Sequence, residues 1–421
     1  MLAAGKGERM WPLTSTRPKP LVEVLCKPLL EYHVEALKKA GIKKVVLAVH
    51  YQEEIMKKKA EELSSKIGIE IKTVKQSTPL GTGHAVLEMI EKESILEDIV
   101  VLYSDIFMTP HMLEKSIKKL SSSTDYAIAA AKVPDVSKYG ALLLSPSGKL
   151  LKIMEKSKTL EGKEGLVNAG MMMLNAGDLS EAIRRTEPSE RGELELTSAI
   201  ELLTKKIDIS VLELDGEWMD VGTPWDLIRA NETSLKEICR EMKVEEEECV
   251  IFDEQKITIE DPVIINGPVM IKGNAELGPC AHIRENTILC GDNKIGFSVQ
   301  VKNSIIMKGA KVPHLNYVGD SIVGERTNLG AGTITANVRH DGKNVKSMLK
   351  GSLVDTGRKK LGAIIGDYVK TGINTSILPG VKIGAWAWIN AGCIVDRDVP
   401  DRAVLKCEQE RKYITREEDK T

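Results

Sequence analysis

Residues 265–307 read INGPVMIKGNAELGPCAHIRENTILCGDNKIGFSVQVKNSIIM, and an aliphatic residue recurs at every sixth position. A six-residue period is typical of a parallel β-helix, in which each aliphatic side chain stacks on the one a coil below. Eight residues in register are improbable by chance, so this stretch predicts a β-helix. The eight are Ile265, Ile271, Leu277, Ile283, Leu289, Ile295, Val301 and Met307.

The same period continues towards the C-terminus with two interruptions. The pattern resembles the hexapeptide-repeat left-handed parallel β-helix, a family whose members typically form homotrimers. Residues 335–364 break the count, so we expect an inserted loop there, and such loops often carry function. After each break the expected core residues are Tyr317, Val323 and Leu329, then Ile365, Thr371, Ile377, Ile383, Ile389 and Val395.

The N-terminal half has a different rhythm, in which short β-rich runs alternate with amphipathic helices. This alternation predicts an α/β fold of the Rossmann-like kind, with a mixed, mostly parallel sheet whose ligands bind at the carboxyl ends of the strands. The expected strands are 43–49, 70–75, 98–103 and 126–132. The expected organisation is an α/β domain over 1–230, a connecting helix over 231–249, the β-helix over 250–400 and a tail over 401–421.

Composition narrows the class of protein. The chain has 421 residues and a net charge of −2, which gives no reason to expect nucleic acid or a membrane as partner. No apolar run approaches the roughly 20 residues that cross a bilayer. The cysteines form no C-x-x-C pair, so we expect reduced thiols in a cytoplasmic protein. They are Cys26, Cys239, Cys249, Cys280, Cys290, Cys393 and Cys407.

Residues 2–22 (LAAGKGERMWPLTSTRPKPLV) carry the strongest functional signal. Gly5 and Gly7 allow backbone amides to approach phosphate oxygens, and Arg9 and Lys19 offer positive charge. The string is no P-loop, because no Gly-Lys-Ser/Thr follows. It resembles, almost position for position, the signature of sugar-1-phosphate nucleotidylyltransferases. That family usually has a few further residues before the string, so we expect either a short first strand or a start that has been trimmed.

Seven further segments resemble the same family in the same order, from Gln76–His84 to Trp218–Pro224. Ser104 and Ser157 depart from it, standing where the family has Gly and Pro. The resemblance implies nucleotide binding by Leu2, Ala4, Gly5, Gly7, Gln76, Gly81 and Thr82, sugar binding by Gly140, Glu155, Lys156 and Asn168, and Mg²⁺ binding by Asp105 and Asp220. It also assigns catalytic roles to Arg9 and Lys19.

The chemistry implied is attack of a sugar-1-phosphate oxygen on the α-phosphorus of a nucleoside triphosphate, which expels pyrophosphate. Positioning and charge neutralisation dominate such a reaction. Two carboxylates suit Mg²⁺, which prefers oxygen ligands. Arg9 is expected to steady the pyrophosphate, and Lys19 to neutralise the reacting phosphates.

His314 lies where the six-residue register breaks, in KVPHLNYVGD (311–320) ahead of LGAGTITAN (329–337). A lone His is usually a surface residue, but these two segments together resemble the acetyltransferase domain of bifunctional glucosamine-1-phosphate acetyltransferase/uridylyltransferases. In that family the His is the general base for attack of the sugar amine on acetyl-CoA. The resemblance assigns the sugar phosphate to Arg284 and Lys302, sugar hydroxyls and the acetyl group to Tyr317, Asn328 and Asn337, and the coenzyme to Ala331 and Ala391.

The insertion is longer than in bacterial members and looks more like the archaeal type. It is basic, and both a solvated loop and a binding role for Lys343 or Lys346 stay open. We therefore predict a bifunctional enzyme that makes UDP-N-acetylglucosamine and forms a homotrimer or a dimer of trimers. UTP or dTTP, and glucosamine- or galactosamine-1-phosphate, remain candidate substrates.

Two alternatives are weighed against this prediction. One is a monofunctional nucleotidylyltransferase of the thymidylyl, uridylyl or mannose-1-phosphate guanylyl type with a structural β-helix. It would leave His314 and its neighbours idle, and the Gln76 segment fits a pyrimidine better than a guanine. The other is a regulatory subunit that binds nucleotide sugars without turnover. We disfavour it because the expected catalytic and metal-binding residues are all present, namely Arg9, Lys19, Asp105 and Asp220.

Overall fold

The computed structural model describes residues 1–123, 126–190, 192–252, 256–408, 410, 412 and 413. They fall into two compact units, Met1–Ile238 and Cys239–Thr421. Among the described helices none is both long and apolar enough to cross a membrane. Arg191 and residues 409, 411 and 414–421 of the expected tail lie outside the described residues.

The first unit is built on strands that alternate with helices. β3 (Lys44–Val49) and β4 (Glu70–Lys75) pair in parallel. Leu2 forms parallel bridges to both Ala48 and Tyr103, so β3 and β5 (Asp98–Leu102) run in the same direction. Antiparallel pairs also occur, and the longest strand, β10 (Gly165–Asn175), pairs antiparallel with β5 and with β7 (Ala127–Val133).

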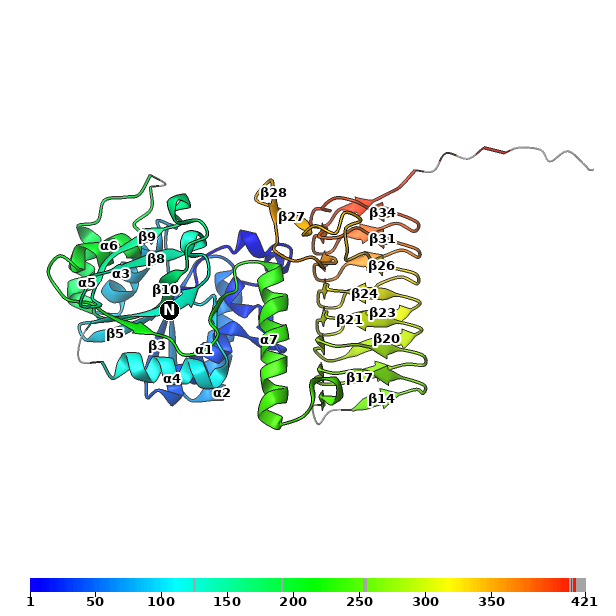
Figure 1. Cartoon of the computed structure of the whole chain (residues 1–421), viewed down its shortest axis with the longest axis horizontal. Coiled ribbons are helices and arrows are strands. Elements are labelled where there is room, and N and C mark those ends of the chain that lie inside the picture. Colours follow the sequence, from blue (N-terminus) through cyan, green and yellow to red (C-terminus); the bar gives the residue numbers. More distant parts are fainter. Residues whose placement is uncertain (124–125, 191, 253–255, 409, 411, 414–421) are drawn as a thin grey trace, which may run out of the picture. The chain divides into compact units, whose positions relative to one another are not determined.

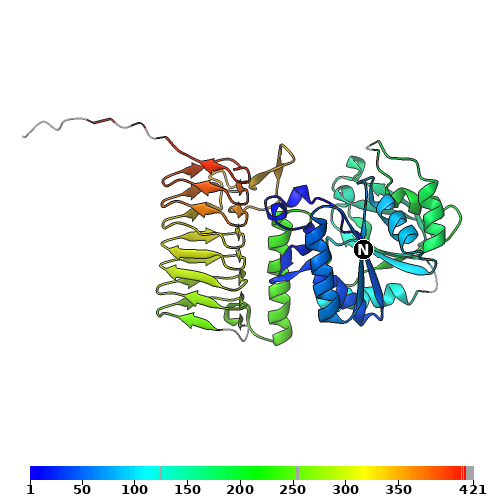
Figure 2. The same ribbon diagram turned by 180° about the vertical axis from the view of Figure 1, so that it is seen from behind.

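Helices cover this sheet and bury its aliphatic side chains (Figures 1 and 2). Gly41 follows the first of them at φ +89°, a left-handed conformation that suits glycine at a helix end. The helices are α1 (Leu29–Lys39), α2 (Glu53–Ile67), α3 (Thr82–Lys92), α4 (Pro110–Ser121), α5 (Ala176–Arg184) and α6 (Leu196–Leu203). The remaining strands are β1 (Glu23–Val24), β2 (Lys27–Pro28), β6 (Ile106–Phe107), β8 (Gly140–Leu144), β9 (Leu150–Glu155), β11 (Ser210–Glu213) and β12 (Met219–Asp220).

The long helix α7 (Pro224–Met242) starts earlier than the connecting helix expected from the sequence. Its start is a capping box, in which the amide of Thr223 donates to Asp226 Oδ2 at 2.8 Å and the amide of Asp226 donates back to Thr223 Oγ1 at 3.4 Å. Pro224 occupies the first turn, where its missing N–H costs nothing.

The expectation that all cysteines are reduced is wrong. Cys239, on α7, and Cys249, just ahead of β13 (Val250–Phe252), form a disulfide with Cα atoms 5.9 Å apart, and both are buried. No C-x-x-C spacing announces this pair, because the chain turns through a 3-10 helix (Glu246–Glu248) and returns to α7. Cys280, Cys393 and Cys407 are free thiols.

We expect replacement of both Cys239 and Cys249 by alanine to lower the Tm. A cross-link closing so short a loop stabilises by about 2–3 kcal/mol, largely through the unfolded chain, which corresponds to about 4–9 °C here. Calorimetry of the oxidised proteins measures the difference, and a C280A variant is the control. Mass spectrometry after maleimide labelling should find Cys280 modified and Cys239 protected. An unchanged Tm together with labelled Cys239 would contradict the assignment.

The second unit is a parallel β-helix of about eight turns, as predicted. Its coils stack short strands into three parallel sheets (Figure 1). The first sheet contains β13, β16 (Val269–Ile271), β19 (Thr287–Leu289), β22 (Ile305–Ile306), β25 (Ile322–Val323), β29 (Ile364–Ile365) and β32 (Lys382–Ile383).

The second sheet contains β15 (Ile264–Ile265), β18 (His282–Ile283), β21 (Gln300–Lys302), β24 (Tyr317–Gly319), β26 (Ile334–Thr335), β31 (Ser376–Ile377) and β34 (Ile394–Val395). The third begins with β14 (Ile257–Ile259), β17 (Ala275–Leu277), β20 (Asn293–Phe297) and β23 (Lys311–His314). Bridges from Asn328 to Lys311 and Lys370 continue it into β30 (Lys370–Thr371), β33 (Trp388–Ile389) and β35 (Val404–Leu405).

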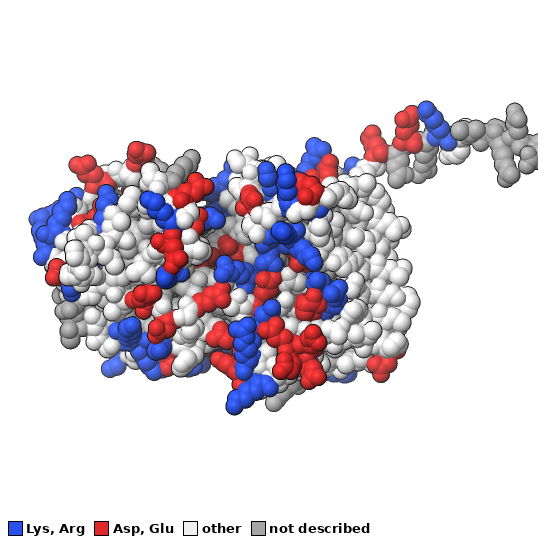
Figure 3. Space-filling model, in the orientation of Figure 1, with Lys and Arg blue, Asp and Glu red and all other residues white. Residues whose placement is uncertain are grey.

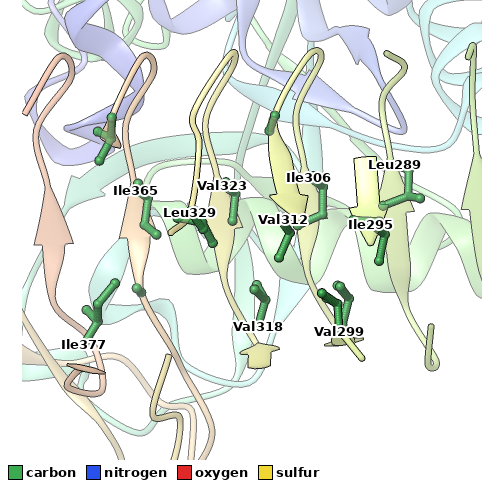
Figure 4. Packing of buried hydrophobic residues seen from close by; sticks show 14 of the residues in the cluster. Leu289, Ile295, Val299, Ile306, Val312, Val318, Val323, Leu329, Ile365 and Ile377 are labelled. Atoms are coloured by element: carbon green, nitrogen blue, oxygen red, sulfur yellow. The ribbon is translucent and has the colours of Figure 1, made fainter. Parts of the chain in front are cut away.

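The core of the β-helix is the predicted stack of aliphatic side chains, with one correction (Figure 4). Ile283 pairs with Val301, but Val301 pairs with Val318, one residue sooner than the sequence count expects. Two corners that are one residue shorter, one before Ile306 and one before Val323, account for the differences from the count. Ile306 and Val318 therefore occupy the core positions that the sequence count assigns to Met307 and Tyr317.

The insertion after Asn337 folds as an antiparallel hairpin, β27 (Lys346–Leu349) and β28 (Ser352–Asp355), which projects from the side of the β-helix (Figures 1 and 2). Two contacts anchor it. Ser347 Oγ donates to the carbonyl of Gly380 at 2.8 Å, and the buried Lys382 Nζ donates to the carbonyl of Met348 at 2.5 Å.

Candidate active sites

The glycine-rich N-terminus folds into a tight loop that places Lys19. Leu2 holds the start of this loop through a hydrogen bond from its amide to the Leu102 carbonyl at 3.0 Å. Gly7 has φ +66°, and a Cβ there would lie 3.0 Å from Lys19 Cβ and from Thr14 Cγ2. Thr14 Oγ1 donates to the Gly7 carbonyl at 3.0 Å. A larger residue at position 7 would displace the segment that carries Lys19.

The two predicted metal ligands are brought side by side by strand pairing. β6 and β12 pair antiparallel with Asp220 opposite Ile106, and the Val221 amide donates to the Asp105 carbonyl at 2.9 Å. Lys19 Nζ lies 2.7 Å from Asp105 Oδ2. Segments that are far apart in the chain therefore converge at the end of β5.

Arg9 and the small residues of the loop line the same region. A Cβ at Gly222 would lie 3.1 Å from the Arg9 guanidinium, so Arg9 packs against the segment that follows Asp220. Ala4 packs on the hydrophobic core of the first unit, and a Cβ at Gly5 would meet no atom within 4 Å. The space beside Gly5 is where the loop can approach a ligand.

Charge is unevenly distributed over the two carboxylates. Burial acts to raise the pKa of Asp105, but Lys19, with a smaller contribution from Arg9, holds that pKa below its ordinary value. Burial, followed by the nearby carboxylate of Asp105, raises the pKa of Asp220 from 3.8 to about 6. Lys19 therefore favours the charged form of Asp105, while Asp220 bears the cost of a second carboxylate nearby.

We expect Asp220→Asn to stabilise the protein in EDTA. A carboxyl whose folded pKa is raised favours folding when it is protonated, so its cost appears as the pH rises through about 4 to 6. The variant should gain about 2–6 °C in Tm at pH 7.5, and the gain should vanish below pH 4. Thermal melts across this range measure it. A gain that grows towards pH 4 would contradict the assigned cause.

The predicted base-binding segment is held by a second distant segment. The buried Gln76 donates from Nε2 to the Gly81 carbonyl at 3.1 Å. Gly81 has φ +103°, and a Cβ there would lie 2.7 Å from the Leu194 carbonyl oxygen. The Leu196 amide donates to Thr82 Oγ1 at 3.0 Å. Residues 76–82 and 194–196 thus form one unit, which explains why both segments resemble the nucleotidylyltransferases.

The predicted sugar-binding residues gather on β8, β9 and β10. Gly140 pairs with Glu155 across the hairpin, and a Cβ at Gly140 would lie 3.0 Å from Glu155 Oε1. Lys156 follows at φ +41°, with its amide donating to the Tyr139 carbonyl at 3.0 Å. Asn168 Oδ1 accepts from the Gly170 amide at 2.9 Å.

Two aromatic residues of this region had no role in the sequence-based prediction. Trp218 Nε1 donates to the Ala169 carbonyl at 3.0 Å, and its ring meets Tyr139 edge-on at 5.5 Å. Burial raises the pKa of Tyr103, whose hydroxyl bonds the Asn168 side chain. In the sequence, the signal for these two residues was their position at the ends of strands, since Tyr103 follows β5 and Trp218 precedes β12.

In the β-helix, one cluster of predicted acetyl-transfer residues is assembled on the second sheet. Lys302 and Tyr317 come from neighbouring strands, β21 and β24, and Arg284 follows β18 one coil earlier. Lys302 Nζ lies 3.1 Å from Glu285 Oε1, and Arg284 Nε lies 3.3 Å from the other oxygen of the same carboxylate.

Asn337 joins this cluster from the start of the insertion. Its Nδ2 donates to the Tyr317 hydroxyl at 3.2 Å and to Asp320 Oδ2 at 2.5 Å. Its carbonyl accepts from the Leu361 amide at 3.0 Å, which closes the base of the insertion. Asp320 is buried and was assigned no role from the sequence, although it stands in the quoted motif.

His314 lies on the other side of a corner from this cluster. It is exposed and ends β23, and Leu315 turns the corner at φ +52° before Tyr317 begins β24. Asn328 is not placed with Tyr317, because it pairs with strands of the third sheet. The sequence could not show this separation, since the face of each residue depends on where the corners fall.

The predicted coenzyme residues lie near one another on a corner. The carbonyl of Ala331 accepts from the Asn374 amide at 2.8 Å, and a Cβ at Gly372 would lie 2.4 Å from the Ala391 amide nitrogen. The coil that carries Gly372 and Asn374 therefore lies between the coils of the two alanines. Lys343 and Lys346 lie on the insertion, where Lys346 opens β27 and is exposed.

Comparison with known proteins identifies the family. A family model described as nucleotidyl transferase matches residues 1–237, and one described as GMPPB C-terminal domain matches residues 265–371. A bifunctional sugar-1-phosphate nucleotidylyltransferase/acetyltransferase of Sulfurisphaera tokodaii is 42% identical over 418 residues, which are 95% of this chain and 97% of the relative. The bifunctional protein GlmU of Methanocaldococcus jannaschii is 39% identical over 95% of both chains.

The chain belongs to this family of bifunctional sugar-1-phosphate nucleotidylyltransferases/acetyltransferases. Membership confirms the prediction of two activities on one chain, and with it the α/β domain followed by a parallel β-helix. Members of this family carry both activities, so the monofunctional alternative with a purely structural β-helix does not hold.

Proposed function

We propose that the protein acetylates glucosamine-1-phosphate with acetyl-CoA and then transfers UMP from UTP to the N-acetyl sugar-1-phosphate, releasing pyrophosphate. The observation that carries the proposal is the cluster of Lys302, Tyr317 and Asn337 beside the corner that bears His314. This cluster combines a cation for a sugar phosphate with neutral polar groups for sugar hydroxyls.

Acetyl transfer requires a base for the sugar amine. The exposed imidazole of His314 takes a proton as the amine nitrogen attacks the thioester carbonyl, and coenzyme A leaves as the thiol. Arg284 and Lys302 hold the phosphate, although both share Glu285 and so carry less net charge than two free cations. Ala331 and Ala391 leave room for the coenzyme between coils.

Nucleotidyl transfer takes place at the carboxylate pair of the first unit. Lys19 and Arg9 neutralise phosphate charge that develops as pyrophosphate leaves, while the loop from Leu2 to Gly7 and the Gln76–Thr82 segment position the nucleotide. Glu155, Lys156 and Asn168 orient the sugar.

Asp105 and Asp220 fit a magnesium ion. They supply two carboxylates at one place, and burial together with the neighbouring Asp105 raises the pKa of Asp220. Mg²⁺ prefers oxygen ligands and completes its shell with water and phosphate oxygens. When bound, the ion neutralises phosphate charge and orients the triphosphate. Mg²⁺ should raise the Tm of the wild type but not that of Asp220→Asn.

The β-helix is proposed to form a homotrimer, or a dimer of trimers. Few charged side chains cover the right-hand part of the β-helix in Figure 3, and its outward-facing strands carry exposed apolar residues. Asn328 sits on a different sheet from Tyr317, so a neighbouring copy would bring it to the sugar. The exposed residues include Ile259, Ile264, Phe297, Leu315, Trp388, Ile394 and Val404.

A substrate panel tests the proposal. Free-thiol release from acetyl-CoA is measured with glucosamine- and galactosamine-1-phosphate, and pyrophosphate release with UTP, dTTP, ATP and GTP. We expect activity with UTP and dTTP, and tolerance of both sugars if no side chain reads the epimeric hydroxyl. Absence of thiol release with either sugar would overturn the acetyl-transfer assignment. A cytoplasmic location is part of the same proposal, since the substrates are metabolites of the cell interior.

A further inference from the structure

Asp320 occupies an unusual position for a carboxylate. It lies at a corner of the β-helix with φ +49° and is 2% exposed. Both of its oxygens accept hydrogen bonds from amide side chains, one from Asn303 Nδ2 at 2.7 Å and one from Asn337 Nδ2 at 2.5 Å. Hydrogen bonds to a buried charged group are short and strong, so this pair orders both amides.

The corner itself does not require a carboxylate. Asn303 takes the matching place one coil earlier, also with a positive φ of +46°, and Gly362 takes it one coil later without a positive φ. The Asp320 amide donates to the Lys302 carbonyl at 2.9 Å, and the Gly362 amide donates to the Asp320 carbonyl at 2.8 Å. Any residue that tolerates a positive φ makes these bonds. The side chain of Asp320 therefore serves something other than the turn.

The contacts of Asp320 determine which way Asn337 faces. A carboxylate only accepts hydrogen bonds, so Asn337 must turn its NH₂ group towards Asp320 and its Oδ1 away. The same NH₂ donates to the Tyr317 hydroxyl at 3.2 Å. The hydroxyl accepts that bond and keeps its own proton to donate elsewhere. The Asp320 carboxylate thus leaves Asn337 Oδ1 to accept a hydrogen bond and the Tyr317 hydroxyl to donate one.

We propose that Asp320 is a positioning residue for acetyl transfer, which presents the Asn337 acceptor and the Tyr317 donor to the amino sugar. The inference rests on the proposed function of the Tyr317–Asn337 cluster. The acceptor suits an N–H or O–H hydrogen of the sugar, and the donor suits a sugar or acetyl oxygen. A reversed amide would face the sugar with the wrong polarity.

Asp320→Asn tests the proposal, because asparagine has nearly the same shape and tolerates the left-handed backbone. It also supplies an NH₂ group that competes with that of Asn337. We expect the kcat of acetyl transfer to fall about 10–100-fold, with the KM for acetyl-CoA unchanged. Nucleotidyl transfer by the same chain should stay within about twofold. Asp320→Gly places the residue of the next coil, Gly362, at this corner and should lower acetyl transfer in the same way. This second variant keeps the test valid if the asparagine variant folds poorly.

Two controls separate positioning from folding. Asp367 is also a buried carboxylate at a corner, where Oδ1 accepts from the Glu325 amide at 2.7 Å, and Asp367→Asn should leave the acetyl-transfer kcat unchanged. In a double-mutant cycle, Asp320→Asn should cost little more once Asn337 is alanine, because it acts through that residue.

The proposal is overturned if Asp320→Asn leaves acetyl transfer unchanged, lowers both activities equally, or has its full effect in the Asn337→Ala background. These results differ from a failure of the proposed function. In that case wild-type protein would release no thiol with either amino sugar, or His314→Ala would leave thiol release unaffected.

Discussion

Replacement of Asp105 by asparagine is expected to lower the kcat of nucleotidyl transfer by at least about 100-fold, even in saturating Mg²⁺. Asp105 is the carboxylate to which Lys19 is paired at 2.7 Å, and Asp220 faces it across β6 and β12. Without its charge, Lys19 loses its anchor and the proposed metal site loses one of its two carboxylates. Removal of one preorganised electrostatic group costs about 10²–10³ in rate.

Acetyl transfer provides the internal control for this variant. The residues assigned to acetylation all belong to the second unit, so Asp105→Asn should acetylate the amino sugar at the wild-type rate. Asp215→Asn is the matched variant, since Asp215 also pairs with a lysine, Lys115 at 3.0 Å, but is exposed. Near-normal pyrophosphate release by Asp105→Asn would show that Asp105 is no metal ligand.

Replacement of His314 by alanine is expected to lower acetyl transfer by about 10²–10⁴-fold, the range for loss of a general base. Few other groups near the corner between β23 and β24 can take a proton at neutral pH. Tyr317 and Asn337 would still bind the sugar, so the KM values should change little. Free-thiol release measures the effect.

His282→Ala is the control for this prediction. His282 lies on β18 of the same β-helix, and its Nε2 is 2.7 Å from Asn266 Oδ1. The control should keep wild-type acetyl transfer, and both variants should keep pyrophosphate release. Equal loss in both His variants would indicate a general effect on the β-helix. Full activity in His314→Ala would remove His314 from the mechanism.

The fold was predictable because its signals are local and periodic. A residue every six positions must face the same way in a coil with flat faces, so the aliphatic stack follows directly from the count. The count failed only at Met307 and Tyr317, because the corners before Ile306 and before Val323 are one residue shorter. In the first unit the parallel strands were visible as apolar runs, while the antiparallel direction of β10 was not, since an apolar run carries no direction.

The candidate sites were predictable in part. Lys19, Asp105 and Asp220 were expected together and lie together, because strand ends meet at one edge of the sheet. Asp320 and Trp218 were missed, since each acts on a backbone or side chain remote in sequence. The Cys239–Cys249 pair was missed for the same reason: nothing in its spacing requires the chain to return on itself.

By itself, the amino-acid sequence determined the kinds of structure and the kinds of chemistry in this protein. Periodicity specifies which side chains are buried, and the glycine-rich string specifies a tight loop, because both depend on neighbouring residues. Only the tertiary structure decided which groups meet. The length of one corner placed Tyr317 on the surface, and the contact of Asp320 with Asn337 determined the hydrogen-bond polarity that the cluster presents. Such contacts join residues whose separation along the chain carries no signal of their distance in space.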